Sequence, residues 1–254
     1  MPRRLGQHFL VRDSILERLA EAACGLHTPR VIEIGPGRGA LTRYLLPRTD
    51  ELHAIELDRV LVSYLEEKFA SEPKLHVHAA DVLATDLTQW GAAVLTGNLP
   101  YYITSPIVEC FLALDGRFAA AVFLMQREVA ERIAAAPGSR DYGYLSVAAQ
   151  LVCDVELVCN VPAEAFRPPP KVDSAALRFT RKPYQRPDLP GLLRFVSRCF
   201  AQKRKMLRNN LRLYYGAPVD ALPEARLRAE QLAIDDFVRL RAQLESPKSN
   251  PDPL

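Results

Sequence analysis

The chain has 254 residues, a length that suits one large and one smaller domain. Its residues are 48% hydrophobic and 25% charged, and its formal net charge is +3 at pH 7, which is an ordinary composition for a globular protein. No apolar run reaches the about 20 residues of a membrane-spanning helix, and the start, MPRRLGQHFLVRD, lacks the apolar core of a secretory signal. Five dispersed cysteines without a C-x-x-C pair argue against a disulfide framework or a zinc site, so we expect a cytoplasmic protein with no metal ion and no membrane partner.

Hydrophobic periodicity predicts alternating helices and strands along most of the chain. Helices are predicted at residues 14–24, with Asp13 as the cap, and at 40–46, 59–69, 106–114, 126–136 and 143–152. Strands are predicted at residues 30–35, 51–58, 74–81, 92–98, 117–125, 155–162 and 174–180. This alternation is typical of a doubly wound, Rossmann-like α/β sheet.

The last part of the chain is basic and reads as helical. Residues 181–191 hold three prolines and no periodicity, so we expect a linker at 182–191 between a large domain at 1–181 and a small all-α domain at 192–246. Residues 192–215 predict one long helix, and from Arg181 to Tyr215 ten Lys or Arg residues stand against one acid. Such a basic stripe on a near-neutral body indicates a polyanionic partner. The tail, 247–254, is expected to be disordered.

The stretch EIGPGRGALT, between a predicted strand and a helix, indicates a cofactor site. Its glycines permit a tight turn and a close approach of a ligand to the backbone; they are Gly35, Gly37 and Gly39. Glu56 ends the next strand, where a carboxylate can accept both hydroxyl groups of a ribose. The third glycine comes too soon for a dinucleotide fingerprint, and Glu33 would repel a pyrophosphate but suit a cation. S-adenosylmethionine has a ribose, a positive charge and no phosphate, and it fits.

The third predicted strand contributes one further cofactor candidate. Asp81 ends this strand and can accept a hydrogen bond from the exocyclic amine of adenine, although helix capping explains a single aspartate there equally well. Ligands of such sheets bind outside the carboxyl ends of the strands, which favours a cofactor contact. His76 and His78 can share one face of the strand, but without a third ligand nearby a polar strand face is a better explanation than a metal site.

The stretch GNLPYY at residues 97–102 is either a structural turn or a device that activates an amine. The amine of adenine is a poor nucleophile because its lone pair is delocalised into the ring. The side-chain oxygen of Asn98 and the backbone carbonyl of Leu99 would accept from its N–H bonds and favour a tetrahedral nitrogen. Pro100 restricts Leu99 to an extended backbone, and Tyr101 offers a flat face for an extruded base.

Five segments together resemble one family. GQHFL, EIGPGRGALT, ELD, GNLPY and FRPPPKVDSA follow the order and spacing of the ribosomal RNA adenine N6-dimethyltransferases, and the resemblance runs from about Arg4 to Phe237. It implies a Rossmann-like methyltransferase sheet, S-adenosylmethionine as cofactor, and cofactor contacts from His8, Leu10, Gly35, Gly37, Glu56, Asp81 and Asn98. It also implies that Phe166 stacks on the target adenine opposite Tyr101. The family usually has Asn where this chain has His8.

The resemblance also implies a substrate. It would be two adjacent adenosines in a hairpin near the 3′ end of 16S rRNA, in the small ribosomal subunit or its precursor, modified late in assembly. The basic helix and its domain would grip the rRNA backbone, and the residues we expect to do so are Arg194, Arg198, Lys203, Arg204, Lys205 and Arg208. A monomer is expected.

Three alternatives remain. A 23S rRNA methyltransferase that confers antibiotic resistance uses the same chemistry, but such enzymes more often carry Ile at the position of Leu99 and lack PPPKVDS in this form. An RNA-binding factor that has lost catalysis would not need the intact set of Asn98, Pro100, Tyr101 and the two strand-end carboxylates. A nicotinamide-dependent dehydrogenase is disfavoured by the glycine spacing and would bind NAD.

Overall fold

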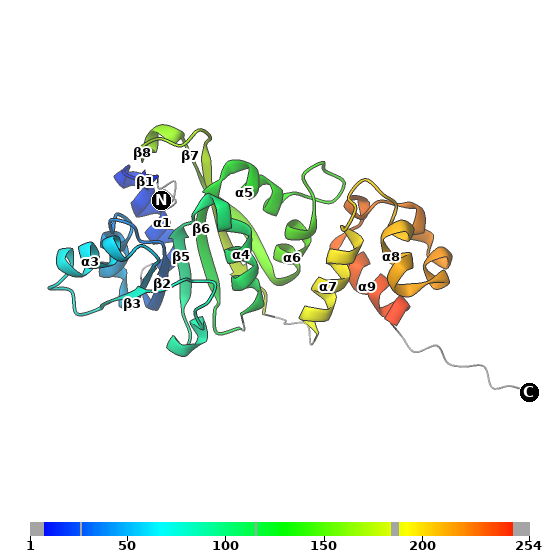
Figure 1. Ribbon diagram of the computed structural model, residues 1–254, viewed down its shortest axis with the longest axis horizontal. Coiled ribbons are helices and arrows are strands. Elements are labelled where there is room, and N and C mark those ends of the chain that lie inside the picture. Colours follow the sequence, from blue (N-terminus) through cyan, green and yellow to red (C-terminus); the bar gives the residue numbers. More distant parts are fainter. Residues whose placement is uncertain (1–7, 26, 115, 184–187, 246–254) are drawn as a thin grey trace, which may run out of the picture.

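The computed structural model describes residues 8–25, 27–114, 116–183 and 188–245, and these form a large sheet-containing part followed by a smaller helical part (Figure 1). Within these ranges, no helix combines the length and the apolar character that crossing a membrane requires. The predicted disordered tail at 247–254 and the middle of the predicted linker lie outside the described residues.

A seven-stranded sheet forms the centre of the large part, in the order β4-β3-β2-β5-β6-β9-β7. The first five strands along the chain are parallel: β2 (Thr28–Ile34), β3 (Thr49–Glu56), β4 (Leu75–Ala79), β5 (Val94–Asn98) and β6 (Ala120–Gln126). The last two, β7 (Cys153–Val161) and β9 (Ser174–Arg181), are antiparallel to their neighbours. The strand order reverses between β2 and β5, and in open α/β sheets this reversal creates a crevice outside the carboxyl ends of the strands.

Helices cover both faces of the sheet, and the strands are therefore apolar on both faces. The helices are α1 (Asp13–Cys24), α2 (Thr42–Leu45), α3 (Arg59–Lys68), α4 (Thr104–Ala113), α5 (Arg127–Ala134) and α6 (Tyr144–Val152). Consecutive strand residues point to opposite faces: Ile32 and Phe123 pack in one buried cluster with α4 and α6, whereas Val31 and Val122 pack in another with α1. The predicted Rossmann-like sheet is confirmed.

Two details of the predicted helices are wrong. Asp13 is not a cap, because α1 begins at Asp13 itself and the preceding Arg12 makes no side-chain capping bond. The carboxylate of Asp13 instead pairs with Arg43. The helix predicted at 40–46 is only the single turn α2, after which the chain continues as a 3-10 helix, Leu46–Arg48, with a proline in its first turn.

The single long helix predicted at 192–215 is also wrong, because the chain breaks it into α7 (Leu189–Cys199) and α8 (Leu207–Tyr215). Helical spacing from the buried Cys199 would place Lys203 on the buried face of a continuous helix, at a large desolvation cost. The chain turns instead, and the side chain of Asn210 donates to the carbonyl oxygens of Cys199 at 2.7 Å and Gln202 at 3.2 Å. Residues 203–205, the KRK sequence, are exposed in this turn.

The helical part is joined to the sheet part through a shared core. Helix α7 begins inside the predicted linker, where Asp188 caps it by accepting from the N–H of Gly191 at 3.0 Å. After α8 the chain forms three 3-10 helices, Ala217–Ala221, Pro223–Arg226 and Ala229–Gln231, and then the last helix, α9 (Ile234–Glu245). Apolar side chains of α6, α7, α8 and α9 belong to one buried cluster, so the described residues of the two parts share a continuous hydrophobic core.

Replacing Asn210 with Ala should destabilise the protein by about 1–3 kcal/mol, because it removes the donor that Asn210 supplies to the carbonyl oxygen of Cys199, buried at the end of α7. Chemical denaturation of the variant and of Asn209→Ala, an exposed neighbour on the same helix, measures this difference. Equal stability of the two variants would contradict the assigned role of Asn210.

Candidate active site

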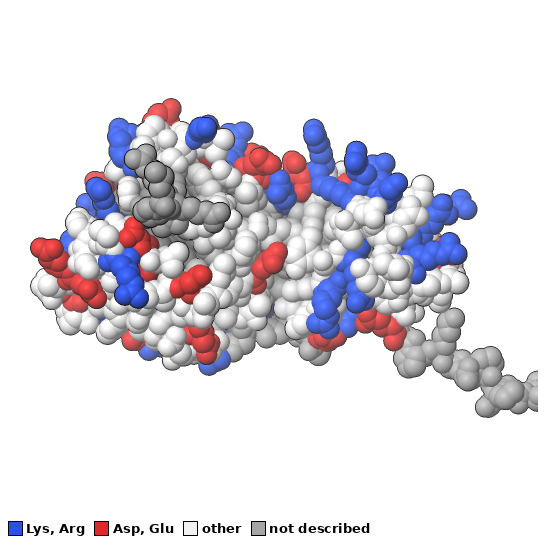
Figure 2. Space-filling model, in the orientation of Figure 1, with Lys and Arg blue, Asp and Glu red and all other residues white. Residues whose placement is uncertain are grey.

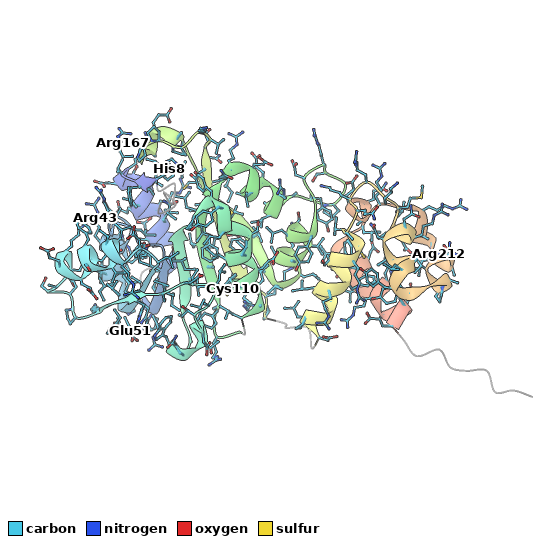
Figure 3. The ribbon with its side chains drawn as sticks, viewed as in Figure 1. His8, Arg43, Glu51, Cys110, Arg167 and Arg212 are labelled. Carbon is cyan, nitrogen blue, oxygen red and sulfur yellow. The ribbon has the colours of Figure 1, made fainter. Side chains whose placement is uncertain are left out.

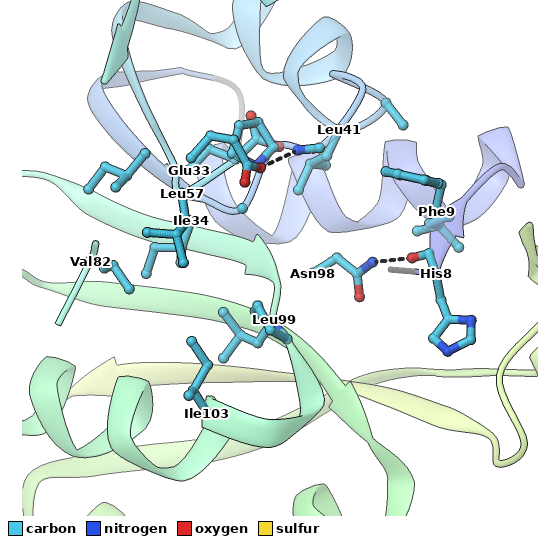
Figure 4. Close-up of a pocket in the computed structure, with 18 of the residues that line it drawn as sticks. His8, Phe9, Glu33, Ile34, Leu41, Leu57, Val82, Asn98, Leu99 and Ile103 are labelled. Atoms are coloured by element: carbon cyan, nitrogen blue, oxygen red, sulfur yellow. Dashed lines mark hydrogen bonds between the residues drawn. The ribbon is translucent and has the colours of Figure 1, made fainter. Parts of the chain in front are cut away.

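A cavity opens at the carboxyl ends of β2 to β5, where the strand order reverses (Figure 4). It brings together residues from four strand ends and from the N-terminal segment. Ten of the eleven side chains predicted to bind the cofactor or act on the base line it: His8, Leu10, Gly35, Gly37, Glu56, Asp81, Asn98, Leu99, Pro100 and Tyr101. Phe166 does not.

The glycine-rich turn after β2 forms one wall of the cavity. Gly35, Gly37 and Gly39 have φ values of +66°, +59° and +74°, which side chains rarely tolerate. A Cβ on Gly37 would lie 3.0 Å from the ring of Phe9, and one on Gly39 would lie 2.5 Å from the ring of Phe69. The turn therefore needs glycine both for its backbone and for its packing.

Glu56, at the end of β3, is buried and held in one orientation. Its Oε2 atom accepts from the N–H of Gly37 at 3.1 Å, and its Oε1 atom accepts from the N–H of Asp58 at 3.0 Å. A carboxylate oxygen can accept more than one hydrogen bond, so both atoms can still receive a hydroxyl. The geometry suits the two adjacent hydroxyl groups of a ribose.

Glu33 lies at the end of β2 and is almost fully buried beside the cavity. Its Oε2 atom accepts from the hydroxyl of Thr42 at 2.6 Å. Burial raises the pKa of Glu33 to about 7, and the nearby charge of Glu56 adds to this effect. A cation bound in the cavity would favour the ionised form of Glu33, which agrees with the charge expected of the ligand.

Asp81 follows β4 and is exposed at the cavity. Its Oδ1 atom accepts from the N–H of Leu83 at 2.9 Å, which forms an Asx turn. Asp81 thus has a structural role, the alternative to a cofactor contact that the sequence analysis left open. One oxygen is thus used by the local turn, and the other has no partner among the described residues. The same side chain can therefore serve both the turn and a ligand.

Asn98 ends β5 with its amide oxygen free. The side-chain Nδ2 donates to the backbone carbonyl of His8 at 3.0 Å (Figure 4), which fixes the orientation of the amide because a carbonyl can only accept. The Oδ1 atom has no partner among the described residues. The N–H of Leu99 donates to the carbonyl of Leu124 on β6 at 2.9 Å, and no hydrogen bond among the described residues ends on the Leu99 carbonyl. Two acceptors thus remain unused beside the cavity.

Pro100 and Tyr101 complete this edge of the cavity. Pro100 has φ −60° and ψ 126°, and its carbonyl is occupied by the N–H of Ile103 and the hydroxyl of Thr104. The Tyr101 hydroxyl lies 2.7 Å from the Oγ atom of Ser174, and burial raises the pKa of Tyr101 above its ordinary value. The phenol therefore stays neutral, and its ring can offer an uncharged flat face.

The sequence profile of the family described as ribosomal RNA adenine dimethylase matches residues 2–244. The chain belongs to the ribosomal RNA adenine dimethylase family.

Relatives and solved structures agree with this membership. A protein of Acidobacterium capsulatum named ribosomal RNA small subunit methyltransferase A is 43% identical over 95% of this chain and 90% of its own. A protein of the same name from Synechococcus elongatus is 40% identical over 96% of this chain and 95% of its own. The structure is similar to a dimethyladenosine transferase from Plasmodium falciparum, with a TM-score of 0.79 and 26% identity over 92% of this chain and 96% of that one. It is also similar to the 23S rRNA methyltransferase ErmE, with a TM-score of 0.69 and 30% identity over 93% and 99%. The protein is an S-adenosylmethionine-dependent rRNA adenine methyltransferase.

Phe166 departs from the position that the family resemblance implies. The short strands β1 (Phe9–Leu10) and β8 (Phe166–Arg167) pair antiparallel, with Leu10 opposite Phe166 (Figure 3 shows His8 and Arg167 together at this edge). The ring of Phe166 is fully buried in the apolar cluster of α1 and does not reach the cavity. The β1–β8 ladder directs this side chain into the core, so in this structure its ring does not face the cavity beside Tyr101.

Sequence reasoning did not assign a role to several residues that line the cavity, among them two aromatic ones, Phe9 and Tyr102. Phe9 packs over Gly37, and its own ring lies 5.0 Å from the guanidinium of Arg38. Tyr102 follows Tyr101 and is 62% exposed. Both residues had a usable signal in the sequence, because Tyr102 belongs to the GNLPYY stretch and Phe9 stands between His8 and Leu10 in GQHFL.

The histidines of β4 lie in a ring stack at the far edge of the sheet. His53 on β3 stacks with His76, His78 and Trp90, with ring centroids 5.1, 5.2 and 4.6 Å away. Burial lowers the pKa of His53 to about 4. Among the residues that the structure describes, no group of three or more His, Cys, Asp or Glu side chains is arranged to hold a metal ion.

The residues predicted to bind RNA lie in the helical part, where Figure 2 shows Lys and Arg side chains gathered. Arg194, Arg204, Lys205 and Arg208 are exposed, and so is Lys203, although its Nζ donates to the carbonyl of Arg140 at 2.6 Å. Arg198 is different, because its guanidinium lies 4.4 Å from the centroid of Tyr214 and donates to the hydroxyl of Tyr215 at 2.9 Å. It is already engaged in packing within the protein.

Replacing Glu33 with Gln should change how stability depends on pH. The raised pKa of Glu33 contributes stability that is fully present below about pH 4.5 and is lost as the pH rises through about 7. The free energy of unfolding of the native protein, relative to Glu33→Gln, should thus fall by about 3 kcal/mol over this interval. Urea denaturation at several pH values measures it, with the exposed Glu17→Gln as control; parallel curves for the native protein and Glu33→Gln would contradict the assignment.

Proposed function

We propose that this protein transfers methyl groups to the N6 atoms of two adjacent adenosines near the 3′ end of 16S rRNA, in the small ribosomal subunit or its precursor. The observation that carries the proposal is a pair of acceptors, the Oδ1 atom of Asn98 and the carbonyl of Leu99, which have no donor among the described residues and line the same cavity as Tyr101. The relatives named ribosomal RNA small subunit methyltransferase A support the small subunit as the target.

The cavity residues fit S-adenosylmethionine. Glu56 would hold the ribose hydroxyls, the free oxygen of Asp81 would accept from the adenine amine, and Gly35 and Gly37 would allow close approach. Glu33 offers a buried carboxyl group whose ionisation a cation would favour. When bound, the cofactor supplies a methyl carbon attached to a positively charged sulfur.

The acceptors would prepare the nitrogen of the target base. If the two N–H bonds of the adenine amine point at the Asn98 oxygen and the Leu99 carbonyl, the nitrogen becomes more tetrahedral and its lone pair is freed from the ring. The same hydrogen bonds would stabilise the positive charge that develops on the nitrogen as the N–C bond forms and the bond between the methyl carbon and sulfur breaks, and the proton would then leave to solvent. Pro100 holds the Leu99 carbonyl in place, and Tyr101 supports one face of the base, which must leave its stack to enter the cavity.

The exposed basic turn of residues 203–205 and the neighbouring Arg194 and Arg208 would bind rRNA phosphates. The packed Arg198 would act indirectly, by holding α7 and α8 together. We expect a monomer that works in the cytoplasm, where ribosomal subunits are assembled.

Methyl transfer from labelled S-adenosylmethionine tests the proposal. The acceptors are 30S particles and, separately, 50S particles, both from a strain that lacks the modification. We expect dimethyladenosine in 16S rRNA alone, identified by nucleoside analysis. Label in 23S rRNA would instead support the resistance class, for which the similarity to ErmE speaks. RNA binding without label would indicate a factor that has lost catalysis.

The same assay tests the role of Asn98. Asn98→Ala should lower methyl transfer by about 100-fold or more, the scale of losing a catalytic acceptor, while RNA affinity stays nearly unchanged. Asn160→Ala, at an exposed position on β7, is the matched control and should keep full activity. Substantial residual activity of Asn98→Ala would contradict the role in activating the amine.

Reversing the charges of Lys203, Arg204 and Lys205 with Glu should weaken RNA binding in a salt-dependent way. Each lost phosphate contact should make the slope of log K against log salt less steep by about 0.7–0.9, so a change of about 2 is expected for the triple variant. Filter binding to 16S rRNA at several salt concentrations measures the slope. Arg59→Glu, on the distant helix α3, should change it little, and an unaltered slope in the triple variant would refute the assigned grip.

A further inference from the structure

We propose that a basic pocket in the helical part binds one backbone phosphate of the RNA, at a point separate from the turn of residues 203–205. This inference extends the proposed function and rests on it. The pocket is lined by residues of α8 and of the two 3-10 helices that follow it, Ala217–Ala221 and Pro223–Arg226. Four of these residues are charged and exposed, and they are Arg208, Arg212, Asp220 and Arg226.

The charge of the pocket is unbalanced. The Nη1 atom of Arg212 lies 3.7 Å from the Oδ2 atom of Asp220, so this arginine has an acidic neighbour. The guanidinium groups of Arg208 and Arg226 form no hydrogen bond or ion pair with any residue that the structure describes. One carboxylate cannot neutralise three guanidinium groups, and the surplus of positive charge attracts an anion.

The backbone already holds the arginines around one space. Arg208 and Arg212 are four residues apart on α8, so they share one face of the helix and their Cα atoms are about 6 Å apart along its axis. The facing wall is tied to the start of the same helix, because the N–H of Leu207 donates to the carbonyl of Leu227 at 2.8 Å. Arg226 directly precedes Leu227, so this bond holds it near α8.

A phosphate group suits these side chains. A guanidinium group presents a rigid fork of N–H donors that matches two oxygens of one phosphate, and it keeps its charge at any physiological pH. Arginines from the two walls can therefore hold one phosphate between them.

An RNA strand is a better source of that phosphate than a free ion. The pocket is open to water, where a lone ion gains little from exposed charges. A strand already bound at the turn of residues 203–205, which directly precedes α8, would present its next phosphates at a high effective concentration. Figure 2 shows Lys and Arg side chains gathered over this part of the molecule.

The pocket lies far from the catalytic cavity. Figure 3 shows Arg212 in the helical part, at the opposite end of the molecule from His8, which lines the cavity. A phosphate bound there cannot take part in methyl transfer. Loss of the pocket should therefore raise KM for the ribosomal subunit and leave kcat unchanged.

The double variant Arg212→Gln/Arg226→Gln tests the proposal by filter binding, at several salt concentrations, of the rRNA that the native protein methylates. Affinity should fall about 10-fold, and the slope of log K against log salt should become less steep by about 0.7–0.9, the change for one phosphate. Asp220→Asn should tighten binding, because it removes the one acid of the pocket; a merely structural role for Asp220 would not have this effect. Arg18→Gln/Arg59→Gln removes two exposed charges from the sheet part and should change the slope little.

Other outcomes overturn the proposal. An unchanged slope in the double variant would exclude a phosphate contact, and a change of about 2 would mean that each arginine binds a phosphate of its own. A lower kcat with an unchanged KM would also contradict a role in binding alone.

Calorimetric titration with inorganic phosphate separates the two sources of the anion. Phosphate that binds the native protein but not the double variant, while both bind rRNA equally, would make this a site for a free ion and overturn the proposal. Failure of the proposed function is distinguishable, because binding is measured without methyl transfer. Label in 23S rRNA alone would refute the 16S target, whereas the slopes measured on that RNA would still decide for or against the pocket.

Discussion

The hydrogen bond from the side-chain amide of Asn98 to the backbone carbonyl of His8 joins two segments that are 90 residues apart in the chain. It engages one of the two N–H bonds of the Asn98 amide, and it sets the orientation of the amide so that the oxygen points away from the His8 carbonyl. It also ties the backbone at His8 to the end of β5, beside the cavity that both residues line. The cofactor wall, the acceptor pair and the ring of Tyr101 all depend on this junction.

Electrostatics divides the molecule into two regions with opposite preferences. Three carboxyl groups, Glu33, Glu56 and Asp81, line the cavity, whereas the turn at residues 203–205 and the helices beside it are basic. Carboxylates attract a cationic ligand and repel phosphates at short range. An RNA strand would therefore remain outside with its backbone on the basic part, and only an uncharged base would enter.

Much of the fold and site was predictable from the sequence because it depends on short-range patterns. The parallel strands were visible as apolar runs, and their ends carried Glu33, Glu56 and Asn98, which the sheet topology must bring to one edge. The break between α7 and α8 and the burial of Phe166 depend on distant partners. Nothing near Lys203 shows that Asn210 would close the end of α7, and nothing near Phe166 shows that pairing with Leu10 would bury it.

The same limit applies to His53, which the sequence analysis did not single out. The register of β3 and β4 sets it opposite His76, and Trp90 arrives from a separate 3-10 helix. A pattern along one strand predicts which face a side chain occupies. It does not predict which rings from other elements will share that face, because that depends on register and loop length.

The contacts between the helical part and the loop before α6 have a geometric consequence. The N–H of Gly138 donates to the carbonyl of Glu230 at 2.7 Å, Lys203 reaches the carbonyl of Arg140, and the rings of Tyr142 and Phe200 meet edge to face at 6.2 Å. These links, with the shared core, set the distance between the basic turn and the cavity. An RNA bound at both places, as proposed above, would have to span this distance, so the folded shape of the RNA would contribute to which substrate is accepted.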